Sequence, residues 1–133
     1  MKILITDDNI VSRKIISNFL NRYGRVDETA SGLEAVDLVQ KAIGENENYD
    51  FVFLDIIMPN MDGREVLTAI RTLEKEAGLT GRQRAKIVMI TVLVNQDAVY
   101  ESIRRQADGY LIKPVTREKI EAELKRLKQQ GKS

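Results

Sequence analysis

The chain has 133 residues, 43% hydrophobic and 31% charged, as expected of one globular domain over residues 1–133 that buries its own core. Its formal net charge of +1 gives no reason to expect direct binding of nucleic acid or of an anionic membrane. Cysteine and histidine are absent, which excludes disulfides, thiolate chemistry and imidazole as an acid, base or ligand. The N-terminus turns acidic too early for a signal peptide and no apolar run reaches membrane-spanning length, so we expect a cytoplasmic protein.

The first half of the chain alternates short apolar runs with amphipathic segments. Residues 3–5 predict a strand, and a helix that ends at Gly24 follows from apolar residues at helical spacing: Val11, Ile15 and Phe19. Residues 25–30 form the least apolar strand candidate, with only Val26 and Ala30 to support it. A helix over 32–43 is indicated by Leu33, Val36 and Val39, and a polar turn over 44–48 leads to a fully apolar strand over 51–54.

The second half repeats this alternation. A helix is predicted over 63–76, with its inward residues at Val66, Leu67, Ile70 and Leu73, and a polar loop follows over 77–85. After a strand over 87–90, a fourth helix begins near the N-cap candidate Asn95, with Val99 and Ile103 on its inner face. A strand over 110–112 and a helix over 116–129 complete the pattern, the latter from Ile120, Leu124 and Leu127.

The order βαβαβαβαβα predicts an α/β fold, because right-handed crossovers produce a doubly wound parallel sheet with helices on both faces. Four of the predicted strands end in polar residues: Asp7 and Asp8, Asp55, Thr91, and Lys113. The carboxyl ends of parallel strands share one edge of the sheet, where such folds bind ligands. Three carboxylates, a hydroxyl and an amine would meet there, a set that suits a metal ion and a phosphoryl group.

Each of these residues also has an ordinary structural interpretation. Asp7 and Asp8 alone would be a turn and a helix N-cap, and Lys113 alone would be a solvated lysine. Thr91 could be a strand-ending β-branched residue and Tyr110 a core residue. The third carboxylate, Asp55, favours a metal site over these ordinary interpretations, because hard divalent cations such as Mg²⁺ prefer carboxylate oxygens.

The motifs together resemble the receiver domain of bacterial two-component response regulators, the CheY-like family, over essentially the whole chain. The resemblance rests on the acidic pair after the first strand, on Asp55 with Met58–Pro59 and Asp62–Gly63 behind it, and on the spacing of Thr91, Tyr110 and Lys113–Pro114. It implies a flavodoxin-like (βα)5 fold with five parallel strands in the order 2-1-3-4-5.

The resemblance also implies roles for individual residues. Asp55 would be the phosphoacceptor, and Asp8, Asp55 and the backbone carbonyl of Ile57 would bind Mg²⁺ directly, with Asp7 acting through water. Lys113 would pair with Asp55 at rest and with a phosphoryl oxygen afterwards, across a cis Lys113–Pro114 bond. Thr91 and Tyr110 would form the switch, Thr91 as a hydroxyl donor to the phosphoryl group and Tyr110 as a side chain that turns inward.

The implied function is a phosphorylation-activated signalling switch rather than an enzyme with a separate substrate. Because the chain has no histidine, a histidine kinase or phosphotransfer protein must supply the phosphoryl group. We expect a stand-alone protein that signals to a protein target through the fourth helix, fifth strand and fifth helix. Two features depart from the family: the bulky Val92 and Leu93 after Thr91, and a long connection over 74–86.

Two alternatives remain open. The chain could be the receiver part of a longer transcription regulator or hybrid kinase. It could also be a Mg²⁺-dependent phosphohydrolase of the haloacid dehalogenase type, but that family has Asp-x-Asp after its first strand, a spacing that Thr6-Asp7-Asp8-Asn9 lacks.

Overall fold

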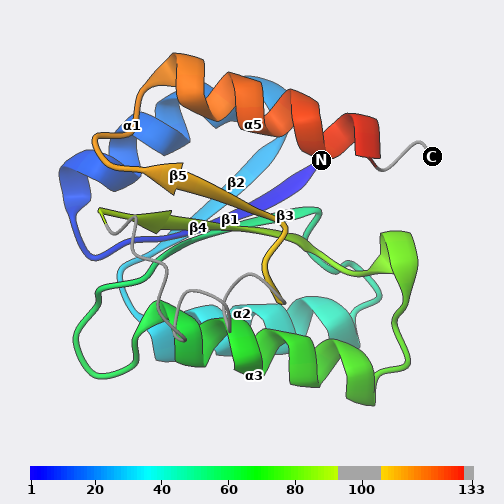
Figure 1. The fold of residues 1–133 in the computed structure, drawn as a ribbon. Helices are drawn as coiled ribbons and strands as arrows, with labels where there is room; N and C mark the ends of the chain where they lie inside the picture. The colour runs from blue at the N-terminus through cyan, green and yellow to red at the C-terminus, as the bar shows by residue number, and fades with distance from the viewer. Residues whose placement is uncertain (93–105, 131–133) are drawn as a thin grey trace.

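The computed structural model describes residues 1–92 and 106–130. Within these ranges the chain forms one sheet of five parallel strands in the order β2-β1-β3-β4-β5 (Figure 1). The strands are β1 (Lys2–Thr6), β2 (Arg25–Thr29), β3 (Phe51–Asp55), β4 (Lys86–Thr91) and β5 (Gly109–Ile112). The predicted fold class and strand order are therefore confirmed, including the strand at 25–29 that only two apolar residues supported.

Helices cover both faces of the sheet, with α1 and α5 on one face and α2 and α3 on the other (Figure 1). Their bounds are α1 (Ile10–Leu20), α2 (Gly32–Gly44), α3 (Gly63–Glu76) and α5 (Arg117–Gln130). Two short 3₁₀ helices follow α1 and α3, namely η1 (Asn21–Tyr23) and η2 (Gly81–Gln83). The predicted fourth helix, with Asn95, Val99 and Ile103, lies outside the described residues.

The sheet separates two hydrophobic cores because alternate strand residues point to opposite faces. Towards α2 and α3, β1 and β3 contribute Leu4, Val52 and Leu54, whereas towards α1 and α5 they contribute Ile3, Ile5, Phe51 and Phe53. Strands buried on both faces need nearly continuous apolar sequence, and this is the pattern that predicts β1 and β3.

Helix α1 is confirmed, but of the three residues whose spacing predicted it only Phe19 lies on its buried face. Val11 is 65% exposed and Ile15 is 39% exposed, whereas Ile16, Phe19 and Leu20 are buried. Leu33 at the start of α2 is likewise exposed. Apolar side chains at the start of both helices, namely Ile10 and Val11 in α1 and Leu33 in α2, therefore lie on the surface rather than in the core.

At the opposite end of the sheet, a set of buried ion pairs that we call the Arg71 network (Arg71, Glu74 and Asp108) joins α3 to β4 and β5. Arg71 Nη1 lies 2.7 Å from Glu74 Oε1, and Nη2 lies 2.7 Å from Asp108 Oδ2. The same carboxylates accept the backbone amides of Ala85 at 2.7 Å and Ile87 at 2.8 Å. The network therefore fixes the end of the long connection at the point where β4 begins.

None of the helices in the described ranges has both the length and the apolar character that crossing a bilayer would require.

Candidate functional site

The carboxyl ends of the strands bring the predicted polar residues together. Residue pairs across the sheet align Thr6 with Leu54, Asp55 with Ile90, and Thr91 with Ile112. Asp7 and Lys113 are the next residues after two of these strands. Carboxylate oxygens of Asp7, Asp8 and Asp55 all lie within 4.8 Å of one another. The predicted convergence of three carboxylates at one edge is thus present in the structure.

Asp55 is the last residue of β3 and is almost completely buried. Its Oδ2 accepts a hydrogen bond from Lys113 Nζ at 3.2 Å, and its Oδ1 accepts one from the backbone amide of Ile57, also at 3.2 Å. The Lys113–Pro114 peptide bond is cis, as expected. Asp55 therefore carries a charge-assisted contact on one oxygen and a main-chain contact on the other.

Asp7 and Asp8 are adjacent in sequence but lie in different environments. Asp7 is fully buried, whereas Asp8 is exposed. Burial raises the pKa of Asp7 to about 6; the Asn9 amide hydrogen bond opposes this rise, and the neighbouring Asp55 carboxylate adds to it. Asp7 Oδ2 has no hydrogen-bond partner among the described residues, although Lys113 Nζ lies 3.8 Å away.

This donor set fits a hard divalent cation. Three clustered carboxylates repel one another, and a buried carboxylate oxygen without a hydrogen bond is costly unless another group compensates for it. Mg²⁺ is bound through one or two carboxylates and keeps several water or phosphate oxygens. The exposed Asp8 carboxylate leaves one side of the cluster open to such ligands.

The turn after Asp55 has a local cause. Asp62 caps α3, accepting the amides of Arg64 and Glu65, and Glu65 completes a capping box with the Asp62 amide. The Gly63 amide donates to the Ile56 carbonyl at 2.9 Å. A Cβ at position 63 would overlap the carbonyl oxygen of Asp55, so only glycine lets α3 start this close to the acidic cluster.

Thr91 and Tyr110 lie on the same face of neighbouring strands. Tyr110 pairs with Met89, and Thr91 is two residues further along β4. Thr91 is buried, and Tyr110 is half-buried against the core under α2 and α3. The side chain of Ile57 is exposed, as is that of Val92. Leu93, the second bulky residue noted in the sequence, lies outside the described residues.

Two basic residues that sequence reasoning missed bind the main chain beside the cluster. Arg13 Nη1 donates to the carbonyl of Asp7 at 2.7 Å. Lys119 Nζ donates to the carbonyls on either side of Lys113, Ile112 at 3.0 Å and Pro114 at 2.9 Å. Their only sequence signal is a position in the first turns of the helix after a site loop, which many solvated basic residues share.

Comparison with known proteins agrees with this geometry. Residues 3–125 match the family model described as the response regulator receiver domain. The chain belongs to this family. As a receiver domain, it is homologous to domains that act as phosphorylation-activated switches in two-component signalling. The recognition from sequence motifs is therefore confirmed.

Curated relatives include much longer histidine kinases. Over 90% of its length, the receiver domain is 30% identical to the osmosensing histidine protein kinase SLN1 of Saccharomyces cerevisiae. Over 94%, it is 32% identical to probable histidine kinase 3 of Oryza sativa subsp. japonica. It spans only 9% and 13% of the length of these two proteins.

Solved structures of receiver domains have the same fold. The Vibrio cholerae chemotaxis response regulator CheY4 is 30% identical, with a TM-score of 0.75 over 95% of this chain and 97% of that one. The receiver domain of the Arabidopsis thaliana histidine kinase CKI1, complexed with Mg²⁺ and BeF3−, is 26% identical. Its TM-score is 0.81 over 96% of this chain and 89% of that one.

Proposed function

We propose that Asp55 is the phosphoacceptor of this receiver domain. One observation carries the proposal: Asp55 is the carboxylate that lies both in the acidic cluster and within 3.2 Å of the Lys113 ammonium. An aspartate is a weak nucleophile, and a phosphoryl group is repelled by clustered carboxylates. Positive charge on both sides of the acceptor is what reduces that repulsion.

Asp8, Asp55 and the Ile57 carbonyl would hold Mg²⁺, with Asp7 acting through water. When bound, the ion would supply positive charge that neutralises the phosphoryl oxygens. Support comes from the clustered oxygens and from the buried Asp7 oxygen without a hydrogen bond among the described residues. The CKI1 receiver domain, which shares this fold, has been solved with Mg²⁺.

In the proposed step, an oxygen of the Asp55 carboxylate attacks the phosphorus of a phosphohistidine. A new O–P bond forms as the N–P bond breaks, and the electron pair of that bond returns to the imidazole nitrogen of the donor. Lys113 would exchange its contact with Asp55 for one with a phosphoryl oxygen. Thr91 would donate its hydroxyl to the same group, and Tyr110, on the same face of the sheet, would respond. No further substrate is turned over.

The donor would be a histidine kinase or a phosphotransfer protein, since this chain contains no histidine. Exposed apolar side chains around the acidic cluster support docking of a protein: Ile10, Val11, Ile57, Val92 and Ile112. Exposed apolar side chains close in sequence to the charged residues of the site are typical of surfaces that contact another protein.

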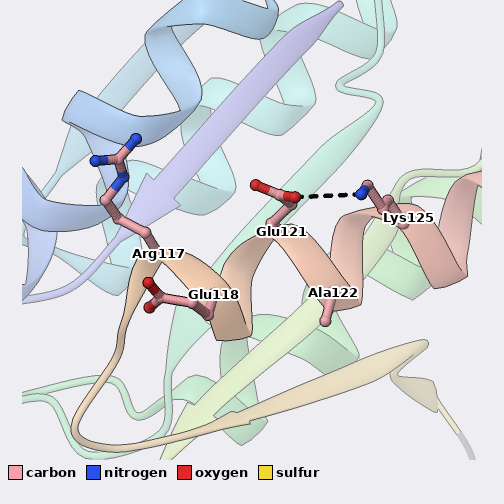
Figure 2. A pocket seen from close by; sticks show the side chains of 5 residues that line it. All are labelled: Arg117, Glu118, Glu121, Ala122 and Lys125. Carbon is pink, nitrogen blue, oxygen red and sulfur yellow. Dashed lines mark ion pairs between the residues drawn. The ribbon is translucent and has the colours of Figure 1, made fainter.

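We also propose that the output is a protein contact on the surface of the predicted fourth helix, β5 and α5, with no direct nucleic-acid or membrane role. The described part of this face includes an open hollow of about 500 Å³ along α5, lined by Arg117, Glu118, Glu121, Ala122 and Lys125 (Figure 2). Its lining includes two basic and two acidic side chains, and Glu121 pairs with Lys125 at 3.2 Å. Mixed charges suit a polar protein surface better than a polyanion.

Residues 1–133 would act as one receiver domain in the cytoplasm, either alone or within a longer protein. The match over residues 3–125 and the shared sheet support the single domain.

The test is phosphorylation by a small phosphoramidate or acyl phosphate donor in the presence of Mg²⁺. We expect the wild type to gain one phosphoryl mass and Asp55→Asn to gain none. Asp50→Asn is the matched control, because Asp50 precedes the other end of β3 and is exposed. Undiminished labelling of Asp55→Asn would contradict the assignment.

A further inference from the structure

Arg13 links three parts of the molecule next to the acidic cluster. It lies in the first turns of α1, its Nη1 donates to the Asp7 carbonyl at 2.7 Å, and its Nε lies 3.3 Å from Glu28 Oε1 on β2. The Arg13 side chain is 15% exposed, so solvent screens these contacts less than it screens a surface ion pair.

The main chain of Asp7 is therefore held on both sides. Its amide donates to the carbonyl of Thr29 at 3.1 Å, at the end of β2. Its carbonyl accepts from Arg13, which is itself fixed to the same strand through Glu28. The loop that carries Asp7 and Asp8 is thus attached to β2 at two points.

Glu28 is a firm anchor for Arg13. It accepts Ser17 Oγ at 2.8 Å and Lys14 Nζ at 3.2 Å as well. Burial acts to raise the pKa of Glu28, but the hydrogen bonds from Ser17 and Lys14 and the nearby positive charges outweigh it and lower the pKa below its ordinary value. Glu28 is therefore ionised at neutral pH and balances the charge of Arg13, which leaves geometry as the main contribution of Arg13 to the cluster.

We propose that Arg13 is a positioning residue that raises the Mg²⁺ affinity of the acidic cluster; the proposal rests on the proposed function. Mutual repulsion among the carboxylates of Asp7, Asp8 and Asp55 opposes the close approach that an ion between them requires. Arg13 holds the loop by its backbone, without occupying a carboxylate oxygen. A loop already in place loses less conformational entropy when it binds an ion.

The experiment compares Arg13→Met with Lys14→Met. Methionine keeps the apolar stem of either side chain and removes its charge. Both residues pair with Glu28, but only Arg13 is bonded to the Asp7 carbonyl. The Mg²⁺ dissociation constant is measured by titration, and the phosphorylation rate is measured across the same Mg²⁺ range.

We expect Arg13→Met to raise the dissociation constant by about tenfold, as loss of an outer contact to a ligand typically does, and Lys14→Met to leave it unchanged. At saturating Mg²⁺ the phosphorylation rate of Arg13→Met should return to the wild-type value. A rise of less than about threefold, an equal rise in Lys14→Met, or a rate that stays low at saturation would overturn the proposal.

If Arg13→Met is unfolded at the assay temperature, Arg13→Gln replaces it, because glutamine is too short to bridge Asp7 and Glu28. The same changes in Mg²⁺ dissociation constant and phosphorylation rate then decide the outcome. Wild-type protein that binds no Mg²⁺, or that is phosphorylated at a residue other than Asp55, would instead refute the proposed function. The two failures are therefore distinguishable.

Discussion

Asp7 and Asp8 show how neighbouring identical residues acquire different tasks. Asp7 is buried, accepts the Asn9 amide at 2.9 Å and has a raised pKa. One of its carboxylate oxygens therefore serves to hold the loop itself. Asp8 is exposed at the open side of the cluster. The more accessible carboxylate is the better candidate for direct contact with an ion that keeps part of its water shell.

Asp8→Ala should therefore raise the Mg²⁺ dissociation constant by about tenfold or more relative to wild type. Asp7→Ala should raise it by less. Isothermal titration of both variants at one pH checks the order. If Asp8→Ala binds like wild type, or if Asp7→Ala is the weaker binder, the ligand roles have been assigned wrongly.

Residue chemistry at the strand ends could be predicted from sequence because two regularities combine. Apolar runs located the strands, and parallel topology placed Asp55, Asp7 and Lys113 at one edge. The contacts of Arg13 and Lys119 could not be predicted in the same way. Long basic side chains have many rotamers, and their choice of a backbone carbonyl depends on loop geometry that hydrophobic pattern does not encode.

Among the elements, α5 is attached to β5 by a partly buried carboxylate. Glu123 Oε2 accepts the Tyr110 amide at 2.9 Å, and Oε1 accepts Arg126 Nε at 2.8 Å. A Cβ at Gly109 would overlap the carboxylate of Glu123, so glycine at this position leaves room for that side chain to reach the Tyr110 amide. Desolvation opposes ionisation of Glu123, but the Arg126 and Tyr110 hydrogen bonds outweigh it and lower its pKa from 4.5.

Glu123→Gln should lower the free energy of unfolding at pH 7 by about 1–2 kcal/mol, because hydrogen bonds to a charged acceptor become neutral ones. The pKa is lowered in the folded state, so this stabilisation is present above the unfolded-state value near 4.5 and disappears as pH falls through the folded-state value. Urea denaturation at a series of pH values should show the full difference between variant and wild type at pH 7 and a shrinking difference as the pH falls below the ordinary glutamate range. A difference independent of pH would refute the electrostatic account.

The bounds of a helix can be predicted from sequence where its capping residues are strong. Its buried face can be predicted where the helix lies over the sheet. Residues 63–76 were predicted as a helix, and α3 has the same bounds, because Asp62 and Glu65 form a capping box. In α1, Phe19 is buried as predicted, but Val11 and Ile15 are exposed, and Ile16 and Leu20 lie in the core instead. The error falls where apolar residues are available to contact a partner rather than the core.

For the whole molecule, Mg²⁺ should act as a stabilising ligand. Because the ion requires carboxylates that only the folded chain brings together, 100-fold excess over the dissociation constant should stabilise the fold by about 2.7 kcal/mol. The melting temperature should then rise by about 5–10 °C, as measured by differential scanning calorimetry. Asp8→Ala should lose most of this rise and Asp50→Asn should retain it. Equal rises in all three proteins would point to binding elsewhere.

The Arg71 network also bears on how readily the backbone opens at the two ends of β4. The amides of Ala85 and Ile87 each donate to a carboxylate that Arg71 also binds, so we expect their protons to exchange slowly with solvent. The turn over 56–62, at the other end of the same sheet, can open without breaking either attachment. We therefore expect the backbone to open more slowly at the Arg71 end of β4 than at the end beside the acidic cluster, a difference that amide hydrogen exchange would measure.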